Sequence, residues 1–379
     1  MVDYANEALS IHKQNKGKIH IELNDKLDSL EKLKLYYTPG VAAVSMKVAD
    51  NKALLRDYTW TGNTVAVVSD GSAVLGLGNI GPEGAMPVME GKALLFRHFA
   101  MINAVPIVLN VHSADEIVAA VKAIATSFGG INLEDIAAPI CFEVERRLIE
   151  ELPIPVMHDD QHGTAIVTLA GLINAAKVTG RDLNTSRATI VGAGAAGVAI
   201  AKLVKEYAPA IKLTAVDSKG IISNKRQDLN ESKLTLLKLS DPIQLNGGLK
   251  EAIKGADIFI GVSSPDILSQ DMVRSMNKQA IIFAMANPDP EIKPELAKKA
   301  GAAVVATGRS DYPNQVNNAL AFPGIFRGAL DNHVNRISEK HKQAAAETIA
   351  ALVEKPDFDN IVPSIDDPRL VSAIARIIV

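Results

Sequence analysis

A glycine-rich turn between an apolar strand and a helix constrains the fold of this chain more than any other feature. The expected strand 188–191 runs into Gly192-Ala193-Gly194-Ala195-Ala196-Gly197, and a helix is expected over 195–207. Such glycines let a backbone turn tightly against a pyrophosphate at the helix N-terminus, and an acid ending the next strand reaches the adenosine ribose. The pattern predicts a dinucleotide site formed by Gly192, Gly194, Ala195, Ala196, Gly197 and Asp217.

Apolar strands alternate with helices along much of the chain. Continuously apolar strands in this order are typical of a parallel sheet covered on both faces. We therefore expect an α/β fold of two domains: an N-terminal α/β substrate domain, 1–160, and a C-terminal Rossmann-type doubly wound parallel sheet, 161–379, with a final short helix. The boundary is expected in a loop over 159–163. Strands are expected at 64–69, 106–111, 154–157, 188–191, 212–216, 257–262, 280–284 and 302–306, and helices at 89–101, 114–126 and 164–179.

Length, charge and composition limit the partners and the cellular compartment to be expected for this protein. A chain of 379 residues has room for two ordinary domains. Its net charge of −3 gives no reason to expect nucleic acid or a membrane as partner. Cys141 is the only cysteine, which fits a reducing compartment. The start of the chain lacks a signal-peptide core, and no apolar run approaches the ~18–20 residues that span a bilayer. We expect a cytoplasmic enzyme.

A second G-x-G-x-x-G match, 76–81, fits a dinucleotide loop poorly. Pro82 follows at once, and the next expected strand ends without an acid. We interpret this stretch as a flexible backbone loop that can approach a ligand closely.

Two acidic pairs are candidate metal ligands. Asp159-Asp160 follows a short apolar strand, and the carboxyl ends of strands border the ligand crevice of α/β proteins. Adjacent carboxylates there repel each other unless a cation neutralises them, and hard oxygen ligands suit Mg²⁺ or Mn²⁺. Glu134-Asp135 is, taken alone, as compatible with a solvated turn or a helix start. His158 and His162 are not expected to bind the metal, because these ions prefer oxygen.

Two residues are candidates for proton transfer. Lys92 begins an apolar helical run, where a lysine can simply extend its head to water. If Lys92 is partly buried near a bound cation, its pKa would fall and its neutral amine could serve as a base. Tyr37 precedes the turn Thr38-Pro39-Gly40, where a phenol can pack or donate a proton.

Taken together, these motifs resemble the malic enzyme family over nearly the whole chain, in a length similar to the short bacterial form. The resemblance implies that Lys92 is the base, Tyr37 the acid and Asp159 a second catalytic acid. It implies Glu134, Asp135 and Asp160 as metal ligands, with Asn287 and Asn318 contacting substrate and cofactor. The motifs are 37–41, 76–81, 87–92, 133–136, 158–165, 217–220, 286–288 and 307–318.

The implied reaction is metal-dependent oxidative decarboxylation of L-malate, through oxaloacetate, to pyruvate and CO₂, with reduction of NAD. The expected metal is Mg²⁺ or Mn²⁺, and the expected assembly is a homodimer. Asp217 favours NAD, although Lys219, Lys225 and Arg226 leave NADP possible. Animal and plant members carry an arginine before the first glycine-rich loop, and this chain has none in 72–75. Which cationic side chain binds the substrate carboxylate is therefore left open, and Arg309 is one candidate.

Three other functions remain open from the sequence. A metal-dependent oxaloacetate decarboxylase with little or no redox activity would use the same site. An amino-acid dehydrogenase also pairs a catalytic lysine with a dinucleotide domain, but needs no metal. A nucleotide-sensing module without catalysis would have no use for the lysine, the tyrosine and the three acids.

Overall fold

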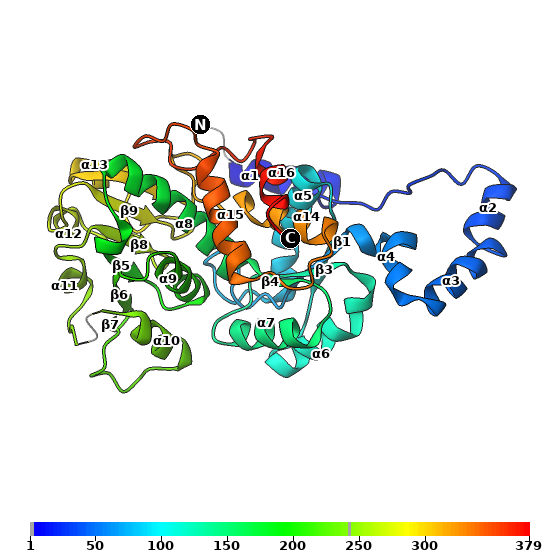
Figure 1. The fold of residues 1–379 in the computed structure, drawn as a ribbon, viewed down its shortest axis with the longest axis horizontal. Helices are drawn as coiled ribbons and strands as arrows, with labels where there is room; N and C mark the ends of the chain where they lie inside the picture. Colours follow the sequence, from blue (N-terminus) through cyan, green and yellow to red (C-terminus); the bar gives the residue numbers. More distant parts are fainter. Residues whose placement is uncertain (1–3, 242–243) are drawn as a thin grey trace.

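Two sheets, one from each half of the chain, form the framework of the molecule (Figure 1). The structure, a computed structural model, describes residues 4–241 and 244–379. The first sheet has the order β2-β1-β3-β4 and is wholly parallel. Its strands are β1 (Thr64–Ser69), β2 (Asn103–Val108), β3 (Gly130–Leu133) and β4 (Val156–His158).

The second sheet has the order β10-β9-β8-β5-β6-β7 and is parallel except for the short β7. This is the doubly wound, Rossmann-type sheet that the alternation of apolar strands and helices predicts. Its strands are β5 (Arg187–Val191), β6 (Lys212–Asp217), β7 (Gly220–Ile221), β8 (Ile258–Gly261), β9 (Ala280–Ala284) and β10 (Ala302–Thr307).

Successive side chains along each strand point to opposite faces of its sheet, so the strands contribute to hydrophobic cores on both faces. In β9, Ile281 and Phe283 join one core, while Ile282 joins another on the opposite face. In β1, Val65 and Val67 likewise face away from the residues between them. This period of two, with both faces apolar, is why the strands require helices on both sides. The covering helices are α5 (Gly81–Ala100), α6 (Ala114–Ile124), α7 (Ile140–Glu151), α8 (Asp159–Thr179), α9 (Ala195–Tyr207), α10 (Glu231–Leu239), α11 (Leu249–Ile253), α12 (Gln270–Arg274) and α13 (Pro294–Lys299).

The last helices of the chain return to its first half. They are α14 (Phe322–Asp331), α15 (Glu339–Ala351) and α16 (Leu370–Ala375). On α14, the rings of Phe322 and Phe326 lie 4.7 and 5.4 Å from the ring of Phe96 on α5. One continuous core therefore joins both sheets. A division of the chain at residue 160 stays a prediction, and α14 packs on the N-terminal side of that division.

Several expected boundaries are wrong, for local reasons. The helix expected from residue 164 begins at Asp159, because acids in a first turn suit the helix dipole. The helix expected from residue 89 begins at Gly81, with Pro82 in its first turn. Strand β2 covers 103–108 instead of 106–111. Strand β3 was not expected, since four residues give too short an apolar run to identify.

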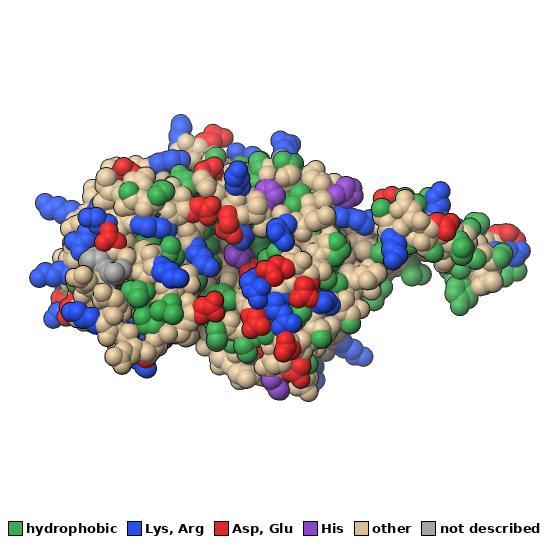
Figure 2. Space-filling view, turned by 60° about the horizontal axis from the view of Figure 1, so that its bottom comes forward, with side chains coloured by type: hydrophobic (Ala, Val, Ile, Leu, Met, Phe, Trp, Pro, Cys, Tyr) green, Lys and Arg blue, Asp and Glu red, His purple; other side chains and the backbone are tan. Residues whose placement is uncertain are grey.

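An arm of residues 19–50 projects from the body of the molecule (Figures 1 and 2). It carries α2 (Leu30–Tyr36) and α3 (Gly40–Asp50), and neither helix buries a residue. Before it lies α1 (Tyr4–Asn15), and after it α4 (Leu55–Tyr58) leads into β1. Hydrophobic side chains stand on the surface of this projection in Figure 2. In the part of the chain that the structure describes, the helices are too short or too polar to cross a bilayer.

The Phe96–Phe326 contact should be one of the main ties between α14 and the N-terminal half. Phe326 is fully buried, so we expect Phe326→Ala to lower the free energy of unfolding by about 3–5 kcal/mol. Phe358→Ala is the matched control, because that ring is 43% exposed and its loss should cost little. Urea unfolding followed by circular dichroism measures both variants, and equal midpoints would refute the packing role.

Candidate active site between two strand ends

The register of two neighbouring strands brings the two acidic pairs together. Leu133 of β3 pairs with His158 of β4, and both strands run in the same direction. The residues that follow each strand, Glu134-Asp135 and Asp159-Asp160, therefore emerge side by side at one edge of the sheet. The backbone N–H of Asp135 donates to Oδ2 of Asp160 at 2.7 Å, which closes the gap between the two strand ends.

Lys92 of α5 lies between these carboxylates. Its Nζ is 2.6 Å from Oδ2 of Asp159 and 2.9 Å from Oε1 of Glu134. The side chain is only 7% exposed, and the ammonium group lies 4.2 Å from the ring centroid of Phe322 on α14. Asn132 donates from Nδ2 to the other oxygen of Glu134 at 2.8 Å. We call Lys92, Glu134, Asp135, Asp159 and Asp160 the acid cluster.

The charged groups of the acid cluster shift one another's pKa values. Burial works to lower the pKa of Lys92, but the carboxylates of Asp159 and Glu134 outweigh burial and hold that pKa above its usual value. Burial raises the pKa of both acids. Burial and the neighbouring Asp160 raise the pKa of Asp135 to about 7. One ammonium group thus faces four carboxyl groups, and the cluster favours additional positive charge.

Two buried oxygens of the acid cluster have no hydrogen-bond partner. They are Oδ2 of Asp135 and Oδ1 of Asp159. Asp135 has a φ of +54°, a left-handed conformation that a side chain rarely adopts, and this turns the residue back toward β4. Burying a carboxylate oxygen without a hydrogen-bond partner costs free energy. Such an oxygen is also the kind of ligand that a hard cation such as Mg²⁺ prefers. Even so, among the described residues no three carboxylate, imidazole or thiol side chains are already spaced as ligands of one ion.

Of the other expected substrate residues, Asn318 lies beside the acid cluster. Gly163 packs so closely on Asp159 that a Cβ there would collide with the carboxylate, and the Cβ of Asn318 lies 3.0 Å from the same position. Asn287 lies against the first glycine-rich loop, since a Cβ on Gly76 would meet its carbonyl oxygen. Arg309 donates to both carboxylate oxygens of Asp311, at 2.8 Å each, so its guanidinium group is already occupied.

Tyr37 does not join the acid cluster. It follows α2 as the C-terminal cap of that helix on the projecting arm, and its side chain is 67% exposed. In Figure 1 the arm lies well apart from the strand ends that carry the cluster. Of the three residues expected to be catalytic, the fold brings Lys92 and Asp159 together and leaves Tyr37 outside.

The predicted dinucleotide loop has the backbone that its glycines require. Gly192 has a φ of +121°, and a Cβ on Gly197 would collide with the carbonyl oxygen of Gly192. A Cβ on Gly194 would meet nothing within 4 Å, so the N-terminus of α9 is open to a ligand at this point. Ala195 and Ala196 begin α9 directly after this turn. An open helix N-terminus with small residues is the anion-binding arrangement that the sequence predicts.

Asp217 ends β6 but is not free. Arg226 donates to both of its carboxylate oxygens, at 2.7 and 2.8 Å, and Nζ of Lys233 lies 2.8 Å from Oδ2. Burial opposes these contacts, yet the hydrogen bonds from Arg226 and Lys233 lower the pKa of Asp217 to about 2. Arg226 and Lys233 therefore neutralise Asp217, the carboxylate from which a preference for NAD was predicted.

A second group of buried charges holds the first turn of α8, which carries Asp159 and Asp160, and sequence reasoning missed this group. Oε1 of Glu145 accepts from the backbone N–H of His158 at 2.7 Å, and Oε2 accepts from Gln161 at 3.1 Å and lies 2.9 Å from Nε2 of His162. Lys342 of α15 lies 3.4 Å from that imidazole. Glu145 follows Val144 on the buried side of α7, and an acid on an apolar face was the available signal.

Comparison with known proteins agrees with this architecture. The family model for the malic enzyme N-terminal domain matches residues 12–149, and the model for the malic enzyme NAD-binding domain matches residues 161–379. A bifunctional malic/malolactic enzyme from Bacillus subtilis (strain 168) is 52% identical over 98% of this chain and 91% of its own length. An NAD-dependent malic enzyme from Geobacillus stearothermophilus is 49% identical over 96% of this chain and 76% of its own length.

A solved structure from Thermotoga maritima, an NAD-dependent malic enzyme, superposes with a TM-score of 0.95 at 47% identity and covers 100% of this chain and 99% of that one.

Glu145 should matter for stability because it is a buried charge with several partners. Burial opposes its ionisation, but His162, Lys342 and His158 lower its pKa to about 2. A carboxylate whose folded pKa is lowered adds stability above its unfolded pKa, near 4.3, and loses it as the pH falls toward 2. We expect Glu145→Gln to cost about 3 kcal/mol at pH 7 and progressively less below about pH 5. Urea unfolding of both proteins between pH 3 and 7 checks this, and a pH-independent difference would contradict it.

Both family models, which between them match most of the chain, and the relatives near 50% identity agree with the site geometry: the chain belongs to the malic enzyme family.

Proposed function

We propose that this chain catalyses the metal-dependent oxidative decarboxylation of L-malate to pyruvate and CO₂, with reduction of NAD(P). The observation that carries the proposal is Lys92, buried between Asp159 and Glu134 at the strand ends, in a chain that also has an open dinucleotide loop. The proposal includes a cytoplasmic location and a homodimer as the working unit. The dinucleotide loop favours this reaction over an oxaloacetate decarboxylase without redox activity, which would not need it.

Glu134, Asp135 and Asp160 are the proposed ligands of Mg²⁺ or Mn²⁺. The unpaired oxygen of Asp135 and the excess of carboxylates over cations fit such an ion. Glu134 is engaged by Lys92 at 2.9 Å, so ligation requires its carboxylate to turn away from the ammonium group. When bound, the ion supplies Lewis-acid polarisation of the malate hydroxyl and carboxylate.

Lys92 is the proposed base for the C2 hydroxyl of malate. Its raised pKa means that it must first give up a proton, and Asp159, 2.6 Å away, is placed to exchange one with it. Lys92 would then take the hydroxyl proton as malate is oxidised to oxaloacetate, and NAD(P), held at the loop of Gly192, Gly194 and Gly197, would supply the hydride acceptor. Loss of CO₂ would give the enolate of pyruvate, and Tyr37 is the proposed acid that protonates C3. Asn287 and Asn318 are the proposed contacts to substrate and cofactor.

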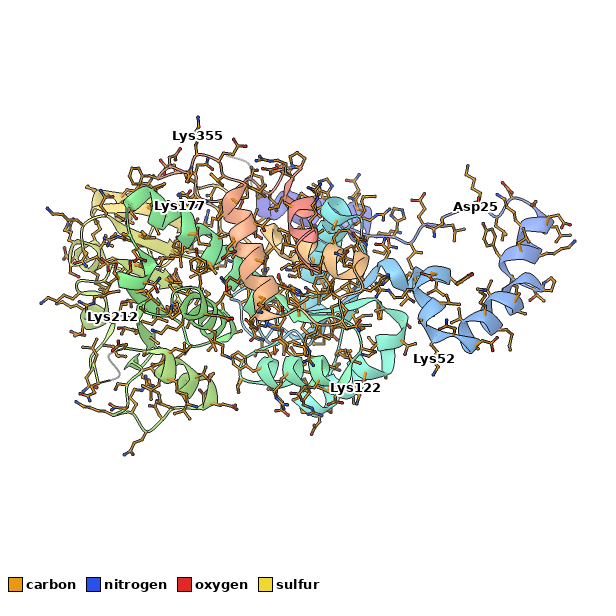
Figure 3. All side chains as sticks on the ribbon, viewed as in Figure 1. Asp25, Lys52, Lys122, Lys177, Lys212 and Lys355 are labelled. Atoms are coloured by element: carbon orange, nitrogen blue, oxygen red, sulfur yellow. The ribbon has the colours of Figure 1, made fainter. Side chains whose placement is uncertain are left out.

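Removing the base should abolish turnover without unfolding the protein. Since a general base commonly contributes 10²–10⁴-fold, we expect Lys92→Ala to reduce malate-dependent NAD(P)H formation by about that factor. Lys122→Ala is the control, because Lys122 lies on the surface of α6 and its ion-pair partner, Glu151, is exposed (Figure 3). Absorbance at 340 nm with L-malate and Mn²⁺ measures both, and near-normal oxidation by Lys92→Ala would refute the assignment.

Cofactor choice should depend on Arg226. Because Arg226 and Lys233 already neutralise Asp217, we propose that the site accepts NADP as well as NAD. Removing the guanidinium group takes a charge partner from a 2′-phosphate and frees Asp217 for a 2′-hydroxyl. We therefore expect Arg226→Ala to shift the ratio of kcat/KM toward NAD by about tenfold, roughly 1.4 kcal/mol.

The surface residue Arg274 provides the control for that measurement, because its partners, Asp271 and Gln270, lie on its own helix. Arg274→Ala should leave the ratio of kcat/KM unchanged. An equal loss with both cofactors in Arg226→Ala would show that Arg226 is structural and does not select the cofactor.

A further inference from the structure

A fully buried carboxyl group joins the ends of two strands in the second sheet. The pairing of β8 with β9 ends at Gly261, whose carbonyl oxygen accepts from the N–H of Met285 at 3.0 Å. Beyond this point Glu291, which belongs to neither strand, bridges the two segments. Its Oε1 accepts from the backbone N–H of Ser263 and its Oε2 from that of Ala286, both at 3.0 Å. Glu291 therefore continues the link between β8 and β9 past the end of their pairing.

The position of Glu291 is fixed from two sides. Its carbonyl oxygen accepts from the N–H of Leu268 at 3.0 Å, and that of Pro290 accepts from Asp266 at 3.2 Å, so its backbone is tied to the loop after β8. Its carboxyl group packs so closely on Gly261 that a Cβ there would collide with it. Burial raises the pKa of Glu291, and the two backbone N–H groups oppose that rise. Because burying a carboxyl group costs free energy, Glu291 is explained by what it holds in place rather than by stability.

One end of this link lies against the dinucleotide loop. Val262 precedes Ser263, the first N–H donor, and its own N–H donates to the carbonyl oxygen of Val191 at 2.9 Å. A Cβ on Gly192 would lie 2.6 Å from the carbonyl oxygen of Val262, so the two backbones are in direct contact. The proposed adenosine side of the site is β6, which leaves the side of β8 and β9 for the other half of a dinucleotide. Glu291 joins the strand ends on that side.

The other end of the link lies on the substrate side. Asn287, a proposed contact to substrate and cofactor, follows Ala286, the second N–H donor. A Cβ on Gly76 would collide with the carbonyl oxygen of Asn287. Gly76 begins the first glycine-rich loop, which runs into α5, the helix that carries Lys92. A chain of close contacts thus runs from the dinucleotide loop through Glu291 to the loop in front of the proposed base.

We propose that Glu291 is a positioning residue for malate oxidation, and that its carboxyl group sets the spacing between the dinucleotide loop and the substrate side of the site. This inference rests on the proposed function. Oxidation requires C2 of malate and the cofactor to meet at contact distance, and an error of about 1 Å can cost about 10²-fold in rate. Decarboxylation of oxaloacetate needs the acid cluster and its metal but no dinucleotide. Disturbing Glu291 should therefore separate the two reactions.

Glu291→Gln tests this role with little change in shape. The amide keeps one acceptor oxygen but turns an NH₂ group toward the other backbone N–H, so one of the two hydrogen bonds is lost. With L-malate, Mn²⁺ and saturating NAD(P), we expect kcat to fall about 10–10²-fold. The Kd of NAD(P)H, measured by fluorescence, should stay within about threefold of wild type, and Mn²⁺-dependent decarboxylation of oxaloacetate without NAD(P) within about twofold.

Two further measurements distinguish positioning from a loss of folded protein. With malate deuterated at C2, the isotope effect on kcat should increase in Glu291→Gln, because transfer from C2 becomes the slowest step. A smaller folded fraction would leave that isotope effect unchanged. In the protein without ligands, hydrogen exchange of peptides that contain Ser263 and Ala286 should become faster, because one of these N–H groups has lost its acceptor.

A second variant moves the carboxyl group without removing it. The methyl group of Gly261→Ala would collide with the side chain of Glu291 and displace it, so the same pattern of losses is expected. Asp182→Asn is the matched control. Asp182 is exposed and accepts from the backbone N–H of Asn184 at 2.9 Å, just before β5 and at the end opposite the dinucleotide loop. This control should leave both reactions unchanged.

The possible outcomes separate the inference from the reaction. Equal losses of malate oxidation and oxaloacetate decarboxylation, an unchanged kcat, or a change in cofactor affinity alone would overturn the positioning role and leave the proposed function intact. If Glu291→Gln does not fold, the same criteria apply to Gly261→Ala. A wild-type protein that does not oxidise malate would overturn the proposed function itself.

Discussion

The contact of Lys92 with Asp159 and Glu134 is the interaction on which the rest of the site depends. It joins α5, the end of β3 and the first turn of α8, three segments far apart in the sequence. A buried ammonium group without partners would cost several kcal/mol, and removing either carboxylate would leave an uncompensated charge. The cluster is therefore a poor source of stability, and its charges fit the proposed proton transfer and cation binding instead.

The sequence predicted one half of this cluster for a physical reason and the other half through resemblance. Asp159-Asp160 follows a recognisable apolar strand, so its position at a strand end could be predicted. Glu134-Asp135 follows Gly-Ile-Asn-Leu, a strand of four residues whose existence depends on pairing with β1 and β4. Because that pairing is non-local, nothing in the short segment distinguishes it from a turn, and only the match to a family motif indicated the ligands.

Long-range contacts account for the residues that the sequence did not reveal. Glu145, His162 and Lys342 come from three helices, and Phe322 reaches Lys92 from the last part of the chain. Their roles follow from how α14 and α15 return to the first half of the chain. Local periodicity predicts which face of a helix is buried, but it does not predict which element covers that face. The glycines of the dinucleotide loop are the opposite case, since their constraint is local and the loop was predicted in full.

The separation of Tyr37 from the acid cluster fits the chemistry required of the two groups. Lys92 must be held by fixed charges, because its proton affinity is set by neighbours at 2.6 and 2.9 Å. A phenol that is proposed to protonate C3 needs position more than electrostatic tuning. It can therefore be carried by a separate segment that docks from outside.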